Sequence, residues 1–470
     1  MAYPLLLFLL MGSYCCAVLG DNGHDFVVVP ASSFFAAEPA CAWSPASRVT
    51  SDPNRASVPL VHRHNRCTPS GASGKPLSLA ERLRRDRARA RYIASRAPGG
   101  RVTTLADGGG VSVPTYLGSA VDSLEYVVTL GLGTPAVEQI VLIDTGSDLS
   151  WVQCKPCNTT ECYPQKDPLF DPSSSSTYAP VLCDTDACRG LAARGVYNNS
   201  CTNGTGPSLC RYQIGYGDGS TTVGLYSTET LTLKPGVSVK NFSFGCGFDQ
   251  EGPNDKYDGL LGLGGAPESL VSQTAAVYGA AFSYCLPPGN GTSGFLTLGA
   301  PSNSTAGFVF TPMHRLPNFA TFYMVTLAGI SVGGKPLDIP PTVFSKGMII
   351  DSGTVITGLP GKAYSALRSA FRSAMSEYPL LPPTDDGLDT CYNFTGFSNV
   401  TVPKVALTFS GGATIDLDVP SGVLLEGCLA FVGGDDTDNL IGVIGNVNQR
   451  TFEVLYDSGK GNVGFRAGAC

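Results

Sequence analysis

The sequence predicts an all-β protein of two similar lobes with a few short helices. The chain has 470 residues, 43% of them apolar, which is enough to bury more than one core. Its 57 Gly and 34 Pro favour short strands joined by tight turns over long helices. An internal repeat divides the body, so we expect duplicated β lobes at residues 112–300 and 301–470 with a cleft between them.

The repeat consists of a strand, a glycine-rich turn, and an apolar strand that ends in aspartate. The first copy extends from Tyr126 to Ser147 and the second from Tyr323 to Thr354. A second matched pair follows, with the sequence DGLLGL at residues 258–263 and LIGVIG at residues 440–445. Two equivalent halves of this kind indicate a duplicated supersecondary unit.

A removable leader is expected before the first lobe. The short apolar run at residues 5–11, followed by small residues, predicts a signal peptide over residues 1–20. Residues 21–111 are expected to form a prosegment, and the arginine run from Arg82 to Arg96 has helical character. That run is either a solvated helix face or an inhibitory segment held on the body by charge.

Charge is divided unevenly between the leader and the body. Residues 1–111 hold 13 Lys/Arg against 7 Asp/Glu, a net +6, and residues 112–470 hold 18 against 31, a net −13. A charge latch between them would loosen on acidification, when carboxylates of the body take up protons. The acidic body also argues against nucleic-acid binding by the mature protein.

Cysteine and sequon counts predict passage through the secretory pathway. Twelve cysteines and eight Asn-X-Ser/Thr sequons follow residue 111, at Asn158, Asn198, Asn203, Asn241, Asn290, Asn303, Asn393 and Asn399. No later apolar stretch reaches about 18 residues, so we expect no membrane anchor. An extracellular monomer is the expectation, with the vacuole or a plastid as alternative locations.

Asp144 and Asp351 end the two copies of the repeat and suit metal-free amide hydrolysis. One carboxylate can take a proton from water while the other gives one to the carbonyl oxygen. Two such groups at close range cannot both ionise readily, so they share a proton and their apparent pKa values separate. A water molecule held between them would be the nucleophile, and no cofactor or metal is needed.

Each aspartate is followed by residues that such a pair requires. The glycines let backbone amides reach the carboxylate, the fourth-position hydroxyls can donate to its outer oxygen, and the second-position hydroxyls could crosslink the two loops. The supporting residues are Thr145, Gly146, Ser147, Ser352, Gly353 and Thr354. A single such loop is weak evidence, because Asp457-Ser-Gly resembles it and reads as a turn. Two copies in equivalent positions of a repeat are far more specific.

One helix is predicted in the second half. Apolar residues recur at three- and four-residue spacing after Pro360, namely Tyr364, Leu367, Phe371, Ala374, Met375 and Tyr378. This stripe is expected to pack in the core and to buttress the Asp351 loop.

Two other chemistries are weaker interpretations of the motifs. Cys154-Lys-Pro-Cys157 could belong to a zinc site, but no second closely spaced pair follows and His314 is the only histidine after residue 111. The sequence Gly329-Ile-Ser-Val-Gly333 matches a nucleophile elbow but falls in the turn of the repeat.

With these motifs, residues 112–470 resemble the pepsin-type aspartic proteases, and within them the plant nepenthesins and chloroplast-nucleoid-type proteases. The resemblance implies a bilobal pepsin-like fold in which Asp144 and Asp351 are catalytic. It implies that Tyr216, between glycines, closes over substrate as the flap tyrosine and that Trp151 hydrogen-bonds it. It also implies protein or peptide substrates. Inhibition by the protein's own prosegment is expected from the charge of the arginine run.

The cysteine distribution is similar to that of nepenthesins, and the resemblance implies six disulfides. The implied pairs are Cys154–Cys157, Cys162–Cys246, Cys183–Cys210, Cys188–Cys201, Cys285–Cys470 and Cys391–Cys428. Spacing alone does not determine the connectivity.

The predicted function is therefore a secreted aspartic endopeptidase that acts at acidic pH. The alternative is a catalytically silent inhibitor or binding protein on the same fold, because some plant relatives have lost an aspartate or part of the flap. A plastid protein that binds DNA is a third hypothesis, but the basic segment lies in the leader. Intact aspartate loops and Tyr216 favour the peptidase.

Overall fold

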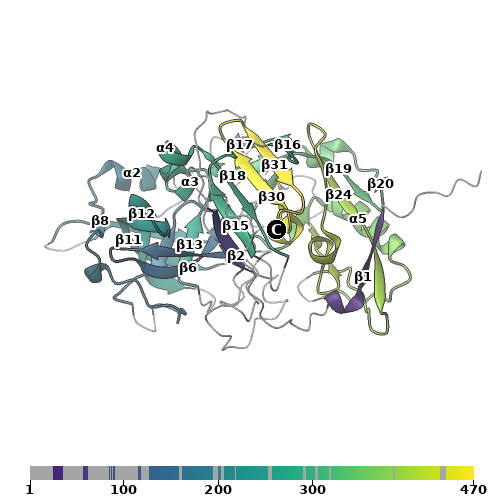
Figure 1. The fold of residues 1–470 in the computed structure, drawn as a ribbon, viewed down its shortest axis with the longest axis horizontal. Coiled ribbons are helices and arrows are strands. Elements are labelled where there is room, and N and C mark those ends of the chain that lie inside the picture. Colours follow the sequence, from purple (N-terminus) through teal and green to yellow (C-terminus); the bar gives the residue numbers. More distant parts are fainter. Residues whose placement is uncertain are drawn as a thin grey trace, which may run out of the picture.

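The computed structural model describes the two lobes and short parts of the leader. The described residues are 25–34, 57–61, 84, 86, 88–89, 115–117, 126–157, 161–193, 200–202, 206–217, 219–251, 257–288, 293–301, 305–316, 319–384, 387–434 and 441–470. The predicted signal peptide 1–20 lies outside them, as does most of the predicted prosegment. The fold is all-β and bilobal, as expected, with few short helices (Figure 1).

Strands from both halves of the chain form the centre of the molecule. The order in the large sheet begins β16-β31-β30-β14-β15-β2 and continues into the first lobe through β5. These strands are β14 (Ala281–Cys285), β15 (Ser293–Leu298), β16 (Val309–Pro312), β30 (Glu453–Asp457), β31 (Asn462–Arg466) and β2 (Ser57–Val61). Because β14 pairs with β30, the sheet joins the two lobes, and β2 adds a leader strand to it.

The first lobe continues this sheet. Its strands are β4 (Thr115–Leu117), β5 (Tyr126–Leu132), β6 (Val137–Asp144), β7 (Trp151–Gln153), β8 (Ala179–Pro180), β9 (Ser200–Cys201), β10 (Cys210–Gly215), β11 (Thr221–Lys234), β12 (Val237–Glu251) and β13 (Gly259–Gly262). Its helices are η3 (Pro172–Ser174), α2 (Asp186–Ala193), α3 (Leu270–Gln273) and α4 (Ala275–Tyr278). Along β11, buried and half-buried residues alternate over much of its length, as in a strand with one face toward the core.

The second lobe is built from shorter sheets. Its strands are β17 (His314–Leu316), β18 (Phe319–Val325), β19 (Leu327–Val332), β20 (Lys335–Pro336), β21 (Met348–Ile350), β22 (Thr357–Leu359), β23 (Asn399–Pro403), β24 (Val405–Phe409), β25 (Thr414–Asp416), β26 (Leu424–Leu425), β27 (Cys428–Leu429), β28 (Phe431–Gly433) and β29 (Gly442–Ile444). Its helices are η4 (Pro341–Phe344), α5 (Gly361–Ala374), η5 (Val419–Val423) and η6 (Asn446–Gln449). The serine of the elbow-like motif lies within β19.

Both copies of the repeat place the aspartate strand beside the second matched motif. In the first lobe β6 runs parallel to β13, with Asp144 opposite Gly262. In the second, β21 runs parallel to β29, with Ile350 opposite Ile444. Each aspartate therefore stands at the end of a buried apolar strand that is held by a neighbour, which fixes its position.

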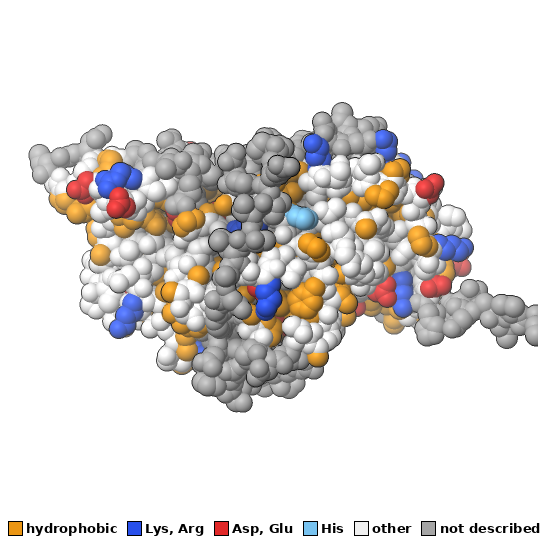
Figure 2. Space-filling model, turned by 90° about the horizontal axis from the view of Figure 1, so that it is seen from above, with side chains coloured by type: hydrophobic (Ala, Val, Ile, Leu, Met, Phe, Trp, Pro, Cys, Tyr) orange, Lys and Arg blue, Asp and Glu red, His pale blue; other side chains and the backbone are white. Residues whose placement is uncertain are grey.

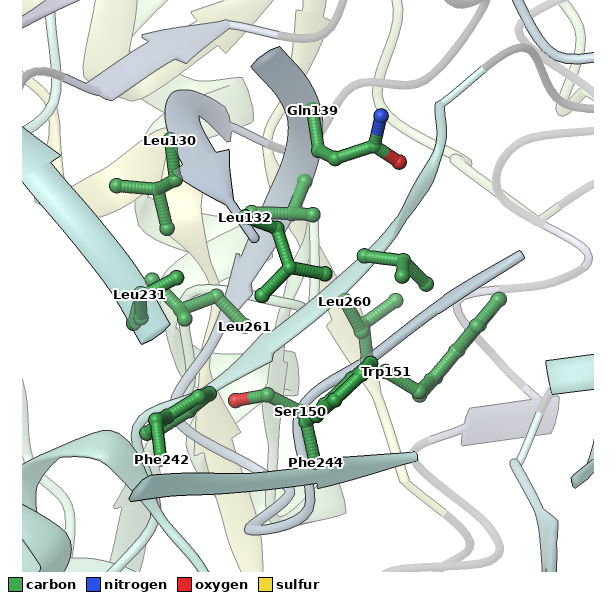
Figure 3. Close-up of a pocket in the computed structure, with 12 residues that line it drawn as sticks. Leu130, Leu132, Gln139, Ser150, Trp151, Leu231, Phe242, Phe244, Leu260 and Leu261 are labelled. Atoms are coloured by element: carbon green, nitrogen blue, oxygen red, sulfur yellow. The ribbon is translucent and has the colours of Figure 1, made fainter. Parts of the chain in front are cut away.

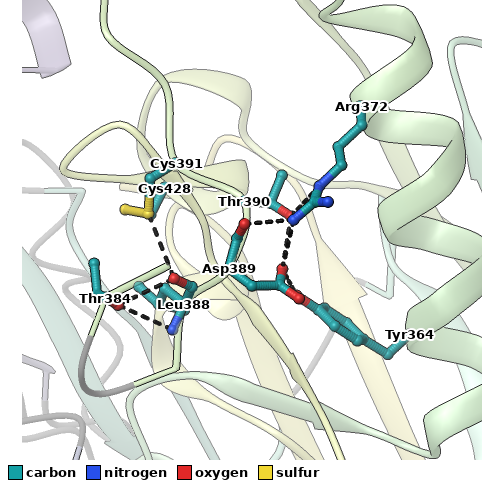
Figure 4. Close-up of a disulfide and its surroundings, with 8 residues drawn as sticks. All are labelled: Tyr364, Arg372, Thr384, Leu388, Asp389, Thr390, Cys391 and Cys428. Carbon is teal, nitrogen blue, oxygen red and sulfur yellow. Dashed lines mark hydrogen bonds and ion pairs between the residues drawn. A yellow bond between two sulfur atoms is a disulfide. The ribbon is translucent and has the colours of Figure 1, made fainter. Parts of the chain in front are cut away.

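Helix α5 covers the predicted position and buries most of the predicted stripe, with Leu367 and Phe371 at 0% exposure. The helix ends at Ala374, which is half-buried, so the buried Met375 and Tyr378 of the stripe lie beyond it. It packs on β28, β19 and β23, none of which carries Asp351, so its role as a buttress of the Asp351 loop stays a prediction. Its polar face binds Asp389. Tyr364 Oη donates to the Asp389 carboxylate, and Arg372 bonds this residue as well (Figure 4). Arg368 also donates to the carboxylate. These contacts anchor the segment before Cys391 to the helix.

Among the described residues six disulfides form, and four of the pairs implied by the resemblance are wrong. Cys285–Cys470 and Cys391–Cys428 pair as implied, the latter beside the Asp389 cluster (Figure 4). The corrected pairs are Cys154–Cys246, Cys157–Cys162, Cys183–Cys201 and Cys188–Cys210, in place of Cys154–Cys157, Cys162–Cys246, Cys183–Cys210 and Cys188–Cys201.

Strand register explains the first correction. Strand β7 runs parallel to β12 with Val152 opposite Cys246, and the Cys154 amide bonds Gly247, so Cys154 and Cys246 lie with Cα atoms 5.4 Å apart. That spacing suits a disulfide. The Cys154–Cys157 pairing that the resemblance implied is therefore excluded by the strand pairing of this chain.

The described leader residues contact the body at three separate places. Strand β1 (Phe26–Pro30) and helix η1 (Ala31–Phe34) lie on the second lobe, and β2 lies in the central sheet (Figure 1). Helical residues from the arginine run, Asp86 and Arg89 among them, lie between the lobes at the two aspartate loops. Among the described residues, no helix combines the length and apolarity needed to cross a membrane.

Candidate active site

Asp144 and Asp351 have nearly identical surroundings. The Gly146 amide donates to Asp144 Oδ1 and the Gly353 amide to Asp351 Oδ1, both at 3.0 Å. The hydroxyls of Ser147 and Thr354 donate to the other oxygen of each carboxylate, at 2.5 and 2.6 Å. Both aspartates are buried, at 2% and 0% exposure. The inner oxygens are therefore oriented by amides and the outer ones by hydroxyls.

Beneath the carboxylates, Thr145 and Ser352 bind the two loops together. The Thr145 amide donates to Ser352 Oγ at 3.1 Å, and the Ser352 amide donates to Thr145 Oγ1 at 2.9 Å. Each hydroxyl then donates across to a carbonyl of the opposite strand, Thr145 to Ile350 and Ser352 to Ile143. This reciprocal bonding sets the separation of the two aspartates.

The glycines of the loops are required by the opposite aspartate. A Cβ on Gly353 would lie 2.5 Å from Asp144 Oδ1, and a Cβ on Gly146 would lie 3.0 Å from Asp351 Oδ1. The contact from Gly353 is too short for a real Cβ, so something would have to move, whereas at Gly146 the aspartate would have to give by a few tenths of an ångström. The expectation that glycine serves the local amide contact is thus incomplete, because glycine also makes room for the second carboxylate.

Tyr216 occupies the turn between β10 and β11, where its amide bonds Ser220 and its carbonyl accepts from Gly219. Trp151 Nε1 donates to Tyr216 Oη at 2.7 Å, the contact that the resemblance implied. Burial, and then the charge of Asp144, raise the pKa of Tyr216 well above its ordinary value. The phenol therefore keeps its hydrogen beside the aspartates.

Arg89 of the leader is bound to both aspartates. Its Nε donates to Asp351 Oδ2 at 2.8 Å, and its Nη2 contacts both Asp144 Oδ1 and Asp351 Oδ1, the latter at 3.1 Å. A single nitrogen in contact with both carboxylates shows that one small molecule could bridge them. Burial lowers the pKa of Arg89, but the two aspartates outweigh it and hold that pKa well above its ordinary value.

Asp86, one helical turn before Arg89, caps the residues that follow the Asp351 loop. Its two oxygens accept from the amides of Val355 and Ile356 at 2.6 and 2.7 Å. Burial raises the pKa of this carboxyl to about 7, although the two amides and Arg89 act to lower it. Asp86 and Arg89 therefore bind the site at two points. The Asp86 carboxylate accepts from backbone amides, and the Arg89 guanidinium donates to the two aspartates.

Sequence reasoning did not single out Asp86 and Arg89 within the arginine run. A signal was present, because Asp86 is the only acidic residue between residues 82 and 96. It also missed Asp148, whose carboxylate accepts from Thr321 Oγ1 of the second lobe at 2.6 Å and from the Ala266 amide at 2.8 Å. Burial raises the pKa of Asp148. This contact joins the lobes next to Ser147.

A cavity of about 20 Å³ lies inside the first lobe behind Trp151 (Figure 3). Leucine and phenylalanine side chains from several strands line most of it, and neither aspartate does. It has room for about one water molecule and none for a substrate side chain. This cavity is therefore too small to be a substrate cleft.

Surface charge gives no second site on the face seen in Figure 2. Acidic and basic side chains are scattered there, and the described residues do not gather into a basic patch. Within the described ranges, no group of three or more His, Cys, Asp or Glu is arranged to hold a metal ion. Cys154 and Cys157, the candidate zinc ligands, both form disulfides.

The site and fold define a pepsin-type aspartic protease. Sequence families described as "Xylanase inhibitor N-terminal" and "Xylanase inhibitor C-terminal" match residues 126–300 and 322–467. An aspartyl protease family protein of Arabidopsis thaliana is 42% identical, over 92% of this chain and 90% of its own. Nepenthesin-1 of Nepenthes gracilis is 36% identical, over 77% and 80%. The chain therefore belongs to the plant pepsin-type aspartic proteases.

Solved structures agree on the fold. Conglutin gamma, a basic 7S globulin from lupine seeds, matches with a TM-score of 0.60 at 20% identity, over 77% of this chain and 95% of that one. Basic 7S globulin from soybean matches with a TM-score of 0.59 at 19% identity, over 76% and 94%. At that identity the likeness concerns the fold alone. Membership of the chloroplast-nucleoid-type subgroup stays a prediction.

Proposed function

We propose that the chain is the precursor of a secreted endopeptidase that hydrolyses peptide bonds at acidic pH with a water molecule activated between Asp144 and Asp351. The observation that carries the proposal is the contact of one nitrogen, Arg89 Nη2, with an oxygen of each aspartate. Once Arg89 has left, a water molecule can take its place within reach of both.

The surroundings of the pair suit the chemistry. With one proton shared, the ionised carboxylate takes a proton from water while the protonated one gives its proton to the substrate carbonyl oxygen, which yields a tetrahedral diol. Collapse of the diol breaks the C–N bond, and a proton returns to the amine. The amides and hydroxyls that bond each carboxylate hold it in place and cost no reorganisation during the step.

The leader, residues 21–111, is proposed to keep the precursor latent until it is removed. Arg89 occupies the position of the nucleophilic water, and Asp86 occupies amides of Val355 and Ile356 beside it. In the proposed latch, acid that protonates carboxylates of the body weakens the attraction to the leader, since Arg89 itself keeps its proton. If activation were indifferent to both pH and ionic strength, this charge latch would be wrong.

The second candidate, a silent inhibitor or binding protein, is suggested by the xylanase-inhibitor description of the matching families. It is disfavoured by two complete aspartate loops and by the Trp151–Tyr216 hydrogen bond. An inhibitor has no need to retain either one.

The test is peptidase activity after removal of the leader. Cleavage of an unstructured protein should peak in the acidic range, be blocked by pepstatin, and fall by about 10⁴-fold or more in Asp144→Asn and in Asp351→Asn. Asp457→Asn changes the aspartate of the similar Asp-Ser-Gly turn; it is the matched control and should keep its activity. No pepstatin-sensitive cleavage between pH 2.5 and 7 would favour the binding protein.

Secretion to the cell wall space is proposed from the six disulfides and from sequons on the surface. Asn241, Asn393 and Asn399 are exposed in the structure. Recovery of the protein in the extracellular fluid with an enzymatically removable glycan is expected, whereas retention in a vacuole or plastid would contradict the proposal.

A further inference from the structure

The leader's first described segment, residues 25–34, binds the second lobe away from the aspartates. Strand β1 pairs antiparallel with β23 over five residue pairs, from Phe26 opposite Pro403 to Pro30 opposite Asn399. The Lys404 amide donates to the Asp25 carbonyl at 2.9 Å, and the Ala31 amide to the Ser398 carbonyl at 3.0 Å. The whole segment is thus added to the lobe as an edge strand.

Its side chains belong to the core of that lobe. Val29, Ala31 and Phe34 are 5%, 6% and 6% exposed and lie in the main hydrophobic cluster. The Phe34 ring lies 5.1 Å from the ring of Phe394. Val28, on the other face of the strand, is 64% exposed, so the segment is amphipathic with a two-residue period.

The body is incomplete without this segment. Among the described residues, β23 has β1 as its only strand partner, and the two form a separate two-stranded sheet (Figure 1). Val400 and Val402, opposite Val29 and Val27, are both 0% exposed. Loss of β1 would expose an apolar strand edge, a form that folded proteins avoid.

The chemistry of this contact differs from that of the Arg89 helix. Asp25 is the only ionisable side chain in residues 25–34, and the segment is held by backbone hydrogen bonds and apolar burial. The Arg89 helix is held at the aspartates by ion pairs. Acid or salt that frees the helix leaves the contacts of the segment in place.

We infer that residues 25–34 stay bound to the second lobe after the rest of the leader is removed, so that the mature enzyme is a body with a separate, noncovalently held N-terminal peptide. The occupant of the β23 edge is this segment itself. The inference rests on the proposed removal of the leader, so its test introduces the cut directly.

The test uses the full-length proenzyme with a site-specific protease sequence inserted between Ala37 and Glu38. The fragment released from residues 21–37 contains no cysteine, so no disulfide can retain it. After cleavage, the body is isolated by gel filtration at pH 7 and at pH 4 in 1 M salt, and its peptide content is measured by mass spectrometry. About one fragment per body is expected in both buffers; a fragment that elutes alone would overturn the inference.

Two single substitutions on β1 make the test specific. Val29→Asp places a charge in the core and should lower the retained fragment about tenfold or more, whereas Val28→Asp, on the exposed face, should not change it. Synthetic peptides of residues 25–37 titrated onto the stripped body should show the same difference in affinity. Equal behaviour of the two variants would mean that the docking is not the one described. Circular dichroism reports whether the body remains folded, because the cut leaves Arg89 attached to the body and the enzyme latent.

Discussion

Thr145 and Ser352 each donate a backbone amide to the other's hydroxyl, at 3.1 and 2.9 Å, although 207 residues separate them in the chain. All four atoms are buried, and the two loops that they join carry Asp144 and Asp351. The separation of the carboxylates is therefore controlled by a polar contact between lobes, with the apolar cores of the lobes behind it.

Thr145→Val tests this contact. Valine keeps the shape of the side chain but leaves the buried Ser352 amide without its acceptor, so we expect a loss of about 1–3 kcal/mol in the free energy of unfolding. Urea unfolding of the inactive Asp144→Asn background measures it without self-digestion. Thr414→Val, at an exposed threonine of β25, should change stability by less than about 0.5 kcal/mol. Equal effects of the two changes would rule out a special role for the crosslink.

Gly353→Ala should displace Asp144. The added Cβ would lie 2.5 Å from Asp144 Oδ1, so the carboxylate or the loop must shift, and kcat is expected to fall about 100-fold with little change in KM. Gly358→Ala, five residues further on in β22, has nothing within 4 Å of its Cβ and serves as the control. A Gly353→Ala enzyme as active as the control would contradict the steric argument.

Arg89→Gln should abolish latency. Two buried ion pairs are lost, and the helix should bind the site roughly 100-fold more weakly. The measurement is the initial peptidase rate of the uncleaved proenzyme, with a gel to show that the leader is intact. Arg89→Lys keeps the charge but loses the planar guanidinium, so its initial rate should lie between those of the unchanged proenzyme and Arg89→Gln.

The control for Arg89→Gln is Arg84→Gln, which removes the same charge from an exposed position of the leader. It should leave the precursor latent. If both variants were equally active before cleavage, the overall charge of the leader, and not the contact of Arg89 with the aspartates, would account for latency.

Asp86→Asn should move acid release to higher pH. Burial raises the pKa of Asp86 to about 7 in the docked helix, above its ordinary 3.8, so its contribution to docking is complete below about 3.8 and is lost as the pH rises through about 7. Asp86 thus opposes acid release.

Without that opposition, and with one acceptor fewer for the Val355 and Ile356 amides, the midpoint of activation should rise by roughly half to one pH unit. The pH dependence of proenzyme activation measures it at constant ionic strength. An unchanged or lower midpoint would show that Asp86 is ionised in the docked state.

Much of the site could be predicted from local pattern. The repeat indicated that Asp144 and Asp351 are equivalent, and the stripe after Pro360 predicted the core face of α5, because both signals are contained in short stretches of sequence. The roles of Arg89 and Asp86 were hidden in a run of similar arginines, where composition indicates a charged helix but not which side chain faces the aspartates.

The sequence by itself determined the all-β class, the duplicated halves and the chemistry available at their two aspartate loops, since hydrophobic alternation and turn residues act locally. Only the tertiary structure decided the disulfide connectivity, the clash that excludes a side chain at Gly353, and the binding of residues 25–34 to β23. The physical reason is that each of these depends on strand register and on contacts between segments far apart in the chain, which no local pattern encodes.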